Sequence, residues 1–229
     1  MAKNTGKSIV AGRLSNALFG GFNRAYSQIQ VDPKRYLERV RRAHGLPIRS
    51  FQDMFHMPQE VVDDVADQTI RASMKFAVIE GAGFGLGGFL SIVPDMGVLA
   101  AIVMRMLQKL SLVYGFEYST DEDIARLWLA AATAAGLDLG REFIEKQAVE
   151  RLVPRIMERM AVKMGAEVAE KWTARAIPLV SGAIGGTLNY YFVREWGKRA
   201  KKHFQERHRV LRAHALVPAA ARPILVRGS

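Results

Sequence analysis

Apolar residues recur every three or four positions through most of the chain, which is the spacing of one face of a helix. After residue 58 this spacing is carried by Val62, Val65, Thr69, Ser73 and Phe76. Similar stripes run through residues 157–172 and 192–211. No segment shows the strict alternation that is typical of a strand. The sequence therefore predicts an all-α fold, a single-domain helical bundle.

A glycine-rich apolar run, residues 80–115, lies at the centre of this pattern. Five of its first nine residues are glycine, and each glycine costs about 1 kcal/mol relative to alanine inside a helix. A chain accepts that cost where backbones bend or approach closely. Pro94 suits the first turn of a helix, so we predict a central helical hairpin with two segments meeting near Pro94. A similar short run at residues 183–188 predicts that the segments around Gly85 and Gly186 pack against each other.

Two uncharged apolar runs also permit a membrane interpretation. Residues 81–94 are 14 uncharged residues and residues 176–193 are 18, whereas a spanning helix needs about 20. Both runs carry small residues four positions apart, which lets helices approach closely in either environment. A buried hairpin is the favoured interpretation, and shallow insertion or a re-entrant hairpin is the alternative.

Three regions differ in composition. Residues 1–58 form an amphipathic and basic arm followed by a loop, residues 59–215 form the helical domain, and residues 216–229 form a tail that we expect to be disordered. The N-terminus lacks the continuous apolar stretch of a signal peptide, because glycine and polar residues interrupt it.

Charge and cysteine content bear on the environment of the protein. The 229 residues carry a formal net charge of +11 and include no cysteine. The absence of cysteine excludes disulfides and thiolate metal sites and favours a cytoplasmic location. The excess of positive charge predicts a polyanionic partner, either an anionic membrane surface or nucleic acid.

A candidate polar site is centred on Asp95, a carboxylate inside an apolar run. Because aspartate is rarely buried without a partner, we expect Arg105, Tyr114 or Asn189 to satisfy it. The alternative is a helix N-terminal carboxylate that stabilises the turn at Pro94. Glu80 completes the candidate set and raises a second hypothesis, a hydrolase that uses Glu80 and Asp95 as an acid and base pair. We expect no enzymatic activity.

Motifs for cofactors and metals are weak. The glycines at positions 83, 85 and 88 match a dinucleotide-binding pattern, but no strand precedes them and no acidic residue follows at the required distance. His203 and His208 are five residues apart, which turns them away from each other on a helix. We therefore predict no cofactor and no metal.

The most basic stretch, residues 194–212, keeps an apolar stripe that includes Trp196 and Phe204. These aromatic side chains are expected to pack inward or to dip into a membrane interface. The opposite face is expected to meet lipid phosphates through Arg194, Lys198, Arg199, Lys201, Lys202, Arg207 and Arg209. Nucleic-acid binding is the alternative, although the sequence contains no known nucleic-acid-binding motif.

Two segments resemble the EcsC protein family. The first is the glycine-rich run into Pro94-Asp95 that ends at Tyr114-Gly115, ahead of the acidic residues 121–123. The second runs from Ile177-Pro178 through the glycines to Asn189, aromatic residues and a basic helix. The resemblance covers roughly residues 60–210. It implies a bacterial helical protein tied to the membrane, in some cases to the locus of an ABC transporter. The activity of the family is not established, so the resemblance supplies no catalytic residues. We expect a non-enzymatic accessory or scaffold protein at the inner face of the membrane.

Overall fold

A computed structural model describes residues 11–23, 31–84, 89–117, 121–137, 149–174 and 183–216 of the 229-residue chain. Within these ranges the chain is helical and contains no strand, so the predicted all-α fold is confirmed. A helix over residues 11–23 comes first. The elements that follow are α2 (Pro33–His44), a 3₁₀ turn (Phe51–His56), α3 (Gln59–Phe84), α4 (Phe89–Val113), α5 (Asp121–Ala134), α7 (Val149–Ala174) and α8 (Ala183–Leu216). Residues 216–229, predicted to be a disordered tail, lie outside the described residues apart from the last residue of α8.

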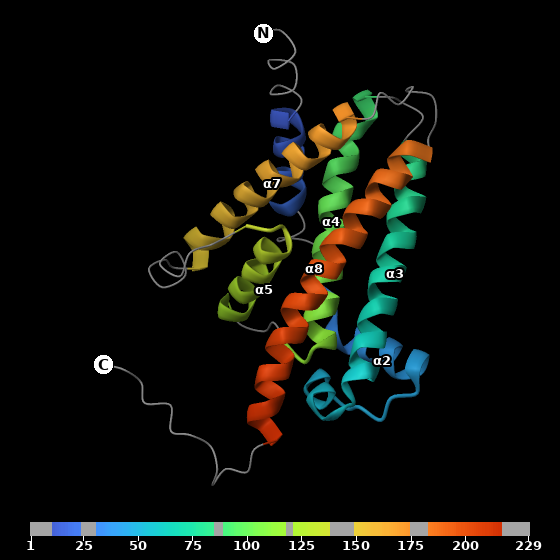
Figure 1. Ribbon diagram of the computed structural model, residues 1–229, viewed down its shortest axis with the longest axis vertical. Coiled ribbons are helices and arrows are strands. Elements are labelled where there is room, and N and C mark those ends of the chain that lie inside the picture. Colours follow the sequence, from blue (N-terminus) through green and yellow to red (C-terminus); the bar gives the residue numbers. More distant parts are fainter. Residues whose placement is uncertain are drawn as a thin grey trace, which may run out of the picture.

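The centre of the fold is formed by α3, α4 and α8. Figure 1 shows α3 and α4 side by side in opposite directions, with α8 lying lengthwise across them and its C-terminal turns extending past α4. The helices α3 and α4 are the two arms of the predicted hairpin, but they do not meet near Pro94 as predicted. Helix α4 begins at Phe89 and continues through Pro94, which lies beyond its first turn. Residues 85–88, between the two helices, lie outside the described residues. None of the described helices has the length and hydropathy that crossing a membrane requires.

A glycine does allow close approach between α8 and its neighbours, but at a position that the sequence analysis did not single out. A Cβ atom on Gly197 would lie 2.9 Å from Cγ2 of Ile70 and 3.1 Å from the sulfur of Met106. Any larger side chain there would push α8 away from α3 and α4. The predicted contact between the segments around Gly85 and Gly186 lies outside the described residues.

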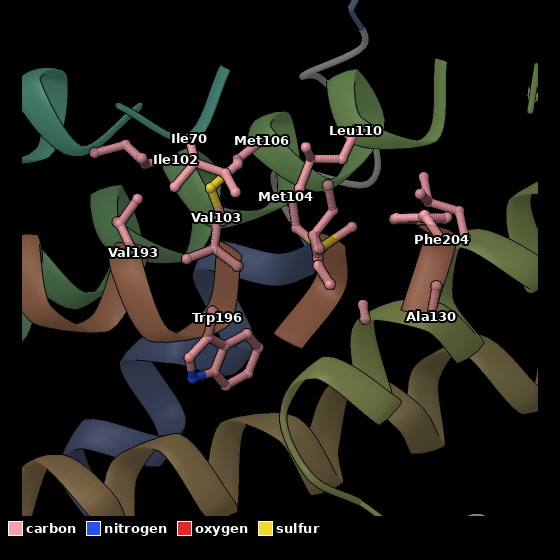
Figure 2. Close-up of a cluster of buried hydrophobic side chains, with 14 of the residues drawn as sticks. Ile70, Ile102, Val103, Met104, Met106, Leu110, Ala130, Val193, Trp196 and Phe204 are labelled. Atoms are coloured by element: carbon pink, nitrogen blue, oxygen red, sulfur yellow. The ribbon is translucent and has the colours of Figure 1, made fainter. Parts of the chain in front are cut away.

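The core beneath α8 is built from aromatic and branched side chains. Figure 2 shows Trp196 and Phe204 of α8 among residues from α3, α4 and α5. Their exposed fractions are 0% for Trp196 and 1% for Phe204. Of the two expectations for these side chains, inward packing is the one the fold adopts, because both are enclosed in the core.

The N-terminal residues 11–23 are also part of this core. Leu14, Leu18 and Phe22 are buried, and the ring of Phe22 meets that of Trp128 edge to face, with the centroids 6.0 Å apart. A Cβ atom on Gly21 would lie 2.6 Å from the Cα atom of Gly97, so the two backbones nearly touch. The first described helix is therefore packed against α4.

Candidate functional site

The site begins at the C-terminal end of α4, where Tyr114 and Gly115 stop the helix. Gly115 has a φ of 83°, a conformation that glycine adopts without steric cost. Its N–H donates to the carbonyl of Leu112 at 2.8 Å, and the N–H of Phe116 donates to the carbonyl of Ser111 at 2.9 Å. This termination fixes the position of Tyr114, whose side chain is fully buried.

Asp63 of α3 is the residue on which the neighbouring helices converge. The hydroxyl of Tyr114 donates to Oδ1 of Asp63 at 2.7 Å. The amide nitrogen of Gln205 on α8 donates to Oδ2 at 2.6 Å, and that of Gln59 donates to Oδ1 at 3.0 Å. Because hydrogen bonds to a carboxylate are stronger than neutral ones, Asp63 joins α3, α4 and α8 at one point.

An ion pair lies next to this point. The Nζ atom of Lys201 is 2.7 Å from Oδ1 of Asp67 and 3.4 Å from the carbonyl oxygen of Asp63. Lys201 is largely enclosed, with 19% of its side chain exposed. Its positive charge is therefore paired with Asp67 inside the fold.

The protonation of Tyr114 is fixed by this environment. Burial first, and then the hydrogen bond and negative charge of Asp63 together with the charge of Asp67, hold the pKa of Tyr114 far above its usual value. The hydroxyl keeps its proton at any physiological pH, so Tyr114 acts as a hydrogen-bond donor and is no candidate for a general base.

His208 also contacts Tyr114, with the ring centroids 5.7 Å apart. Its ring stacks on Phe55, with centroids 4.7 Å apart and an angle of 6° between the planes. Its Nδ1 atom is 2.9 Å from the carbonyl oxygen of Tyr114, and since a carbonyl only accepts, Nδ1 carries the proton. The Nε2 atom is buried and has no hydrogen-bond partner among the described residues. Burial is the main reason that the pKa of His208 is lowered, so the ring is neutral at pH 7.

A cavity of about 520 Å³ opens beside Gly115 and Phe116. The guanidinium of Arg207 lies over the ring of Phe116, 4.7 Å from its centroid, at the wall of this cavity. Across the ranges that the structure describes, no cluster of three or more histidine, aspartate or glutamate residues is arranged to hold a metal ion. The lining residues are Gln52, Phe55, His56, Ser111, Gly115, Phe116, Glu117, Asp123, Leu127, Phe204, Arg207 and Leu211.

Among the residues predicted around Asp95, Tyr114 has a different partner. Tyr114 bonds to Asp63, and it follows Asp95 by 19 residues, or about 28 Å of helical rise along α4. Arg105 is exposed on α4, and Asn189 is buried near the start of α8. Glu80 lies in α3 and Asp95 in α4, but their side chains lie outside the described residues.

The predicted lipid-facing residues fall into two groups. Arg194, Lys198, Arg199, Lys202 and Arg209 are exposed on α8. Lys201 and Arg207 are not free on that surface, because Lys201 pairs with Asp67 and Arg207 lies over Phe116. Arg194 and Lys198 each lie 3.8 Å from the same carboxylate oxygen of Glu195. Their side chains are 45% and 55% exposed, and such surface ion pairs contribute about 0–1 kcal/mol.

Sequence reasoning missed several residues of the site, among them Asp63, Gln205 and His208. Asp63 is one of several acidic residues near the start of α3, where the helix dipole alone explains a carboxylate. His208 was considered only as a metal ligand. The one useful signal was Tyr114-Gly115, which the resemblance to a known family had already emphasised.

Comparison with known proteins identifies the family. The EcsC protein family matches residues 23–208, well over half of the chain, and the protein belongs to it. The match begins earlier than the expected start near residue 60. The chain is also 28% identical, over 154 residues, to Protein EcsC of Bacillus subtilis (strain 168). That alignment covers 63% of this chain and 63% of the relative. No solved structure matches the chain.

Proposed function

We propose that this protein is a cytoplasmic accessory or scaffold protein that docks on the anionic inner face of a membrane and has no enzymatic activity of its own. The docking surface is the exposed basic line of α8, defined as Arg194, Lys198, Lys202 and Arg209. The link to an ABC transporter implied by the family resemblance is part of this proposal, with the transporter as the kind of membrane complex that the docked protein would serve.

The observation that carries the proposal is the geometry of the basic line. Its residues follow one another at intervals of four, four and seven, which return to about the same side of a helix. All four side chains are exposed. Each lysine or arginine near an anionic surface contributes about 1 kcal/mol, so the line supplies about 4 kcal/mol. This free energy corresponds to a dissociation constant of about 1 mM, which favours weak and reversible docking.

The packing of α8 indicates how docking would occur. Trp196 and Phe204 occupy the core, so the apolar face of α8 is not available for insertion into a bilayer. The basic line would therefore lie at the level of the lipid headgroups. Tyr190 and Tyr191, at 42% and 38% exposed, precede Arg194 and are residues that favour the membrane interface. They supply the second contribution that stable attachment requires.

Co-sedimentation with vesicles tests the proposal. The wild-type chain should sediment with anionic vesicles, less so as salt increases, and hardly at all with neutral vesicles. The variant Lys198→Glu/Lys202→Glu/Arg209→Glu should lose this binding. Lys201 is left unchanged, since its replacement would break the ion pair with Asp67.

A matched control changes the same charge on α2 and the loop after it. Lys34→Glu/Arg41→Glu/Arg49→Glu alters three exposed residues and should bind vesicles nearly as well as the wild type. If both triple variants lose binding equally, net charge and not the α8 line is responsible. Salt-dependent binding to duplex DNA without any binding to vesicles would show that the partner is nucleic acid and not a membrane.

A further inference from the structure

A second basic surface lies away from α8, in a groove of about 350 Å³ between α2, α3 and α4. Three of the residues that line it are cations, and most of the others are apolar. None of the lining residues belongs to α8, so the groove is separate from the basic line. The lining residues are Arg39, Ala72, Ser73, Phe76, Val98, Ala101, Ile102, Arg105 and Lys109.

The cations in the groove have no anionic partner within the described part of the chain. No carboxylate lines the groove, and no ion pair joins Arg39, Arg105 or Lys109 to an acidic residue there. The Nζ atom of Lys109 lies 5.7 Å from the ring centroid of Tyr36. Burial first, and then the charges of Arg39 and Arg105, lower the pKa of Lys109. The fold thus holds three like charges within mutual influence, and a bound anion would relieve their repulsion.

The groove is polar at one end and apolar at the other. Along α4, Val98, Ala101, Arg105 and Lys109 share one face, because they are three or four residues apart. Arg105 and Lys109 lie toward α2, while Val98 is about 10 Å of helical rise away from Arg105. On α3, Phe76 is 48% exposed at the apolar part of the groove. A ligand that fills the groove therefore needs a negative head and a short hydrocarbon body.

We propose that this groove binds an amphiphilic phosphate, a phosphate group that carries a hydrocarbon chain, with the phosphate on Arg39, Arg105 and Lys109 and the chain along Phe76, Val98 and Ala101. Guanidinium groups bind phosphate oxygens in pairs, and three cations match the charge of a phosphate monoester better than that of a single carboxylate. The class of ligand is that of an anionic phospholipid headgroup with its first chain carbons.

Calorimetric titration of the full chain with a soluble short-chain lipid tests the site. Dihexanoyl phosphatidic acid should bind at least tenfold more tightly than dihexanoyl phosphatidylcholine or inorganic phosphate. The variant Arg39→Gln/Arg105→Gln should lose at least tenfold in affinity for the phosphatidic acid. Both side chains are exposed, so the variant is expected to fold, which circular dichroism can check.

The control Arg41→Gln/Arg49→Gln removes the same charge from two exposed positions outside the groove and should bind like the wild type. Unchanged affinity in Arg39→Gln/Arg105→Gln would overturn the proposal. Equal affinity for inorganic phosphate and phosphatidic acid would show that the apolar end of the groove does not bind the hydrocarbon chain, and would overturn that part of the proposal. A triple variant of the α8 line should leave this affinity unchanged, which separates the groove from the docking surface.

Discussion

Replacing Tyr114 by phenylalanine removes one hydroxyl from a fully buried side chain and leaves its ring in place. The hydroxyl donates to Asp63 at 2.7 Å, and that bond connects the end of α4 to α3. The ring remains in contact with Phe204 and His208, with its centroid 6.4 Å from that of Phe204. The change in stability therefore reports mainly on the hydrogen bond.

The magnitude follows from the partners that Asp63 retains. A hydrogen bond to a charged group contributes about 1.5–3 kcal/mol. Asp63 keeps the amide donors of Gln59 and Gln205 and is only half-buried, so the lower end of that range applies. We expect Tyr114→Phe to lower the free energy of unfolding by about 1.5–2 kcal/mol. For a chain of this size the melting temperature should fall by about 3–8 °C.

Urea denaturation followed by circular dichroism measures this change. Tyr190→Phe is the control, since Tyr190 is exposed and should change stability by less than about 0.5 kcal/mol. Combining Tyr114→Phe with Asp63→Asn should show a coupling energy of about 1 kcal/mol or more. If Tyr114→Phe is as stable as the wild type, or if the two changes are additive, Asp63 does not hold the helices together as described.

Other predictions concern His208, Gly115 and Gly197. The pKa of His208 is lowered in the fold, so below pH 6.5 the unfolded chain takes up the proton first. The melting temperature should therefore fall between pH 7 and pH 5, and less steeply in His208→Gln. Gly115→Ala should lower the free energy of unfolding, measured by urea denaturation, by about 1–3 kcal/mol. Gly115 has a positive φ, and the added Cβ would lie 2.5 Å from the ring of Phe55. Gly20→Ala is the control, because the space around Gly20 is open and the change should not destabilise the fold. Gly197→Leu should cost a similar amount by separating α8 from α3, as measured by thermal melting.

The sequence could predict the helices, and it could predict much of the basic surface. Helical spacing identified the buried positions of α8 from Phe192 to Phe204, since periodicity depends only on the local chain. The stop at Tyr114-Gly115 was likewise visible, because a glycine after an apolar run commonly ends a helix.

The pairings between distant residues could not be predicted. Asp63 and Tyr114 are 51 residues apart, and Asp67 and Lys201 are 134 apart. A periodic pattern shows that a residue lies at the edge of a helix face, but it does not show which helix packs against that edge. Lys201 was therefore grouped with the exposed cations of α8, and Tyr114 was considered as a partner of Asp95.

The basic groove between α2, α3 and α4 could not be predicted for the same reason. Arg39 was part of a basic helix in the sequence, and Arg105 was a candidate partner for an aspartate. Only the packing of α2 against α3 and α4 brings these charges together with Lys109. Without that packing, nothing in the sequence distinguishes them from ordinary solvated cations.

A site-specific fluorescent label tests most directly whether the basic line of α8 faces an anionic membrane, as proposed. The chain contains no cysteine, so Ala213→Cys on the exposed side of α8 provides a single attachment site. Val162→Cys, 56% exposed on α7, provides the control. With an environment-sensitive label and anionic vesicles, we predict a blue shift at position 213 that is reversed by salt, and no shift at position 162. No shift at position 213, or equal shifts at both positions, would contradict the proposed docking surface.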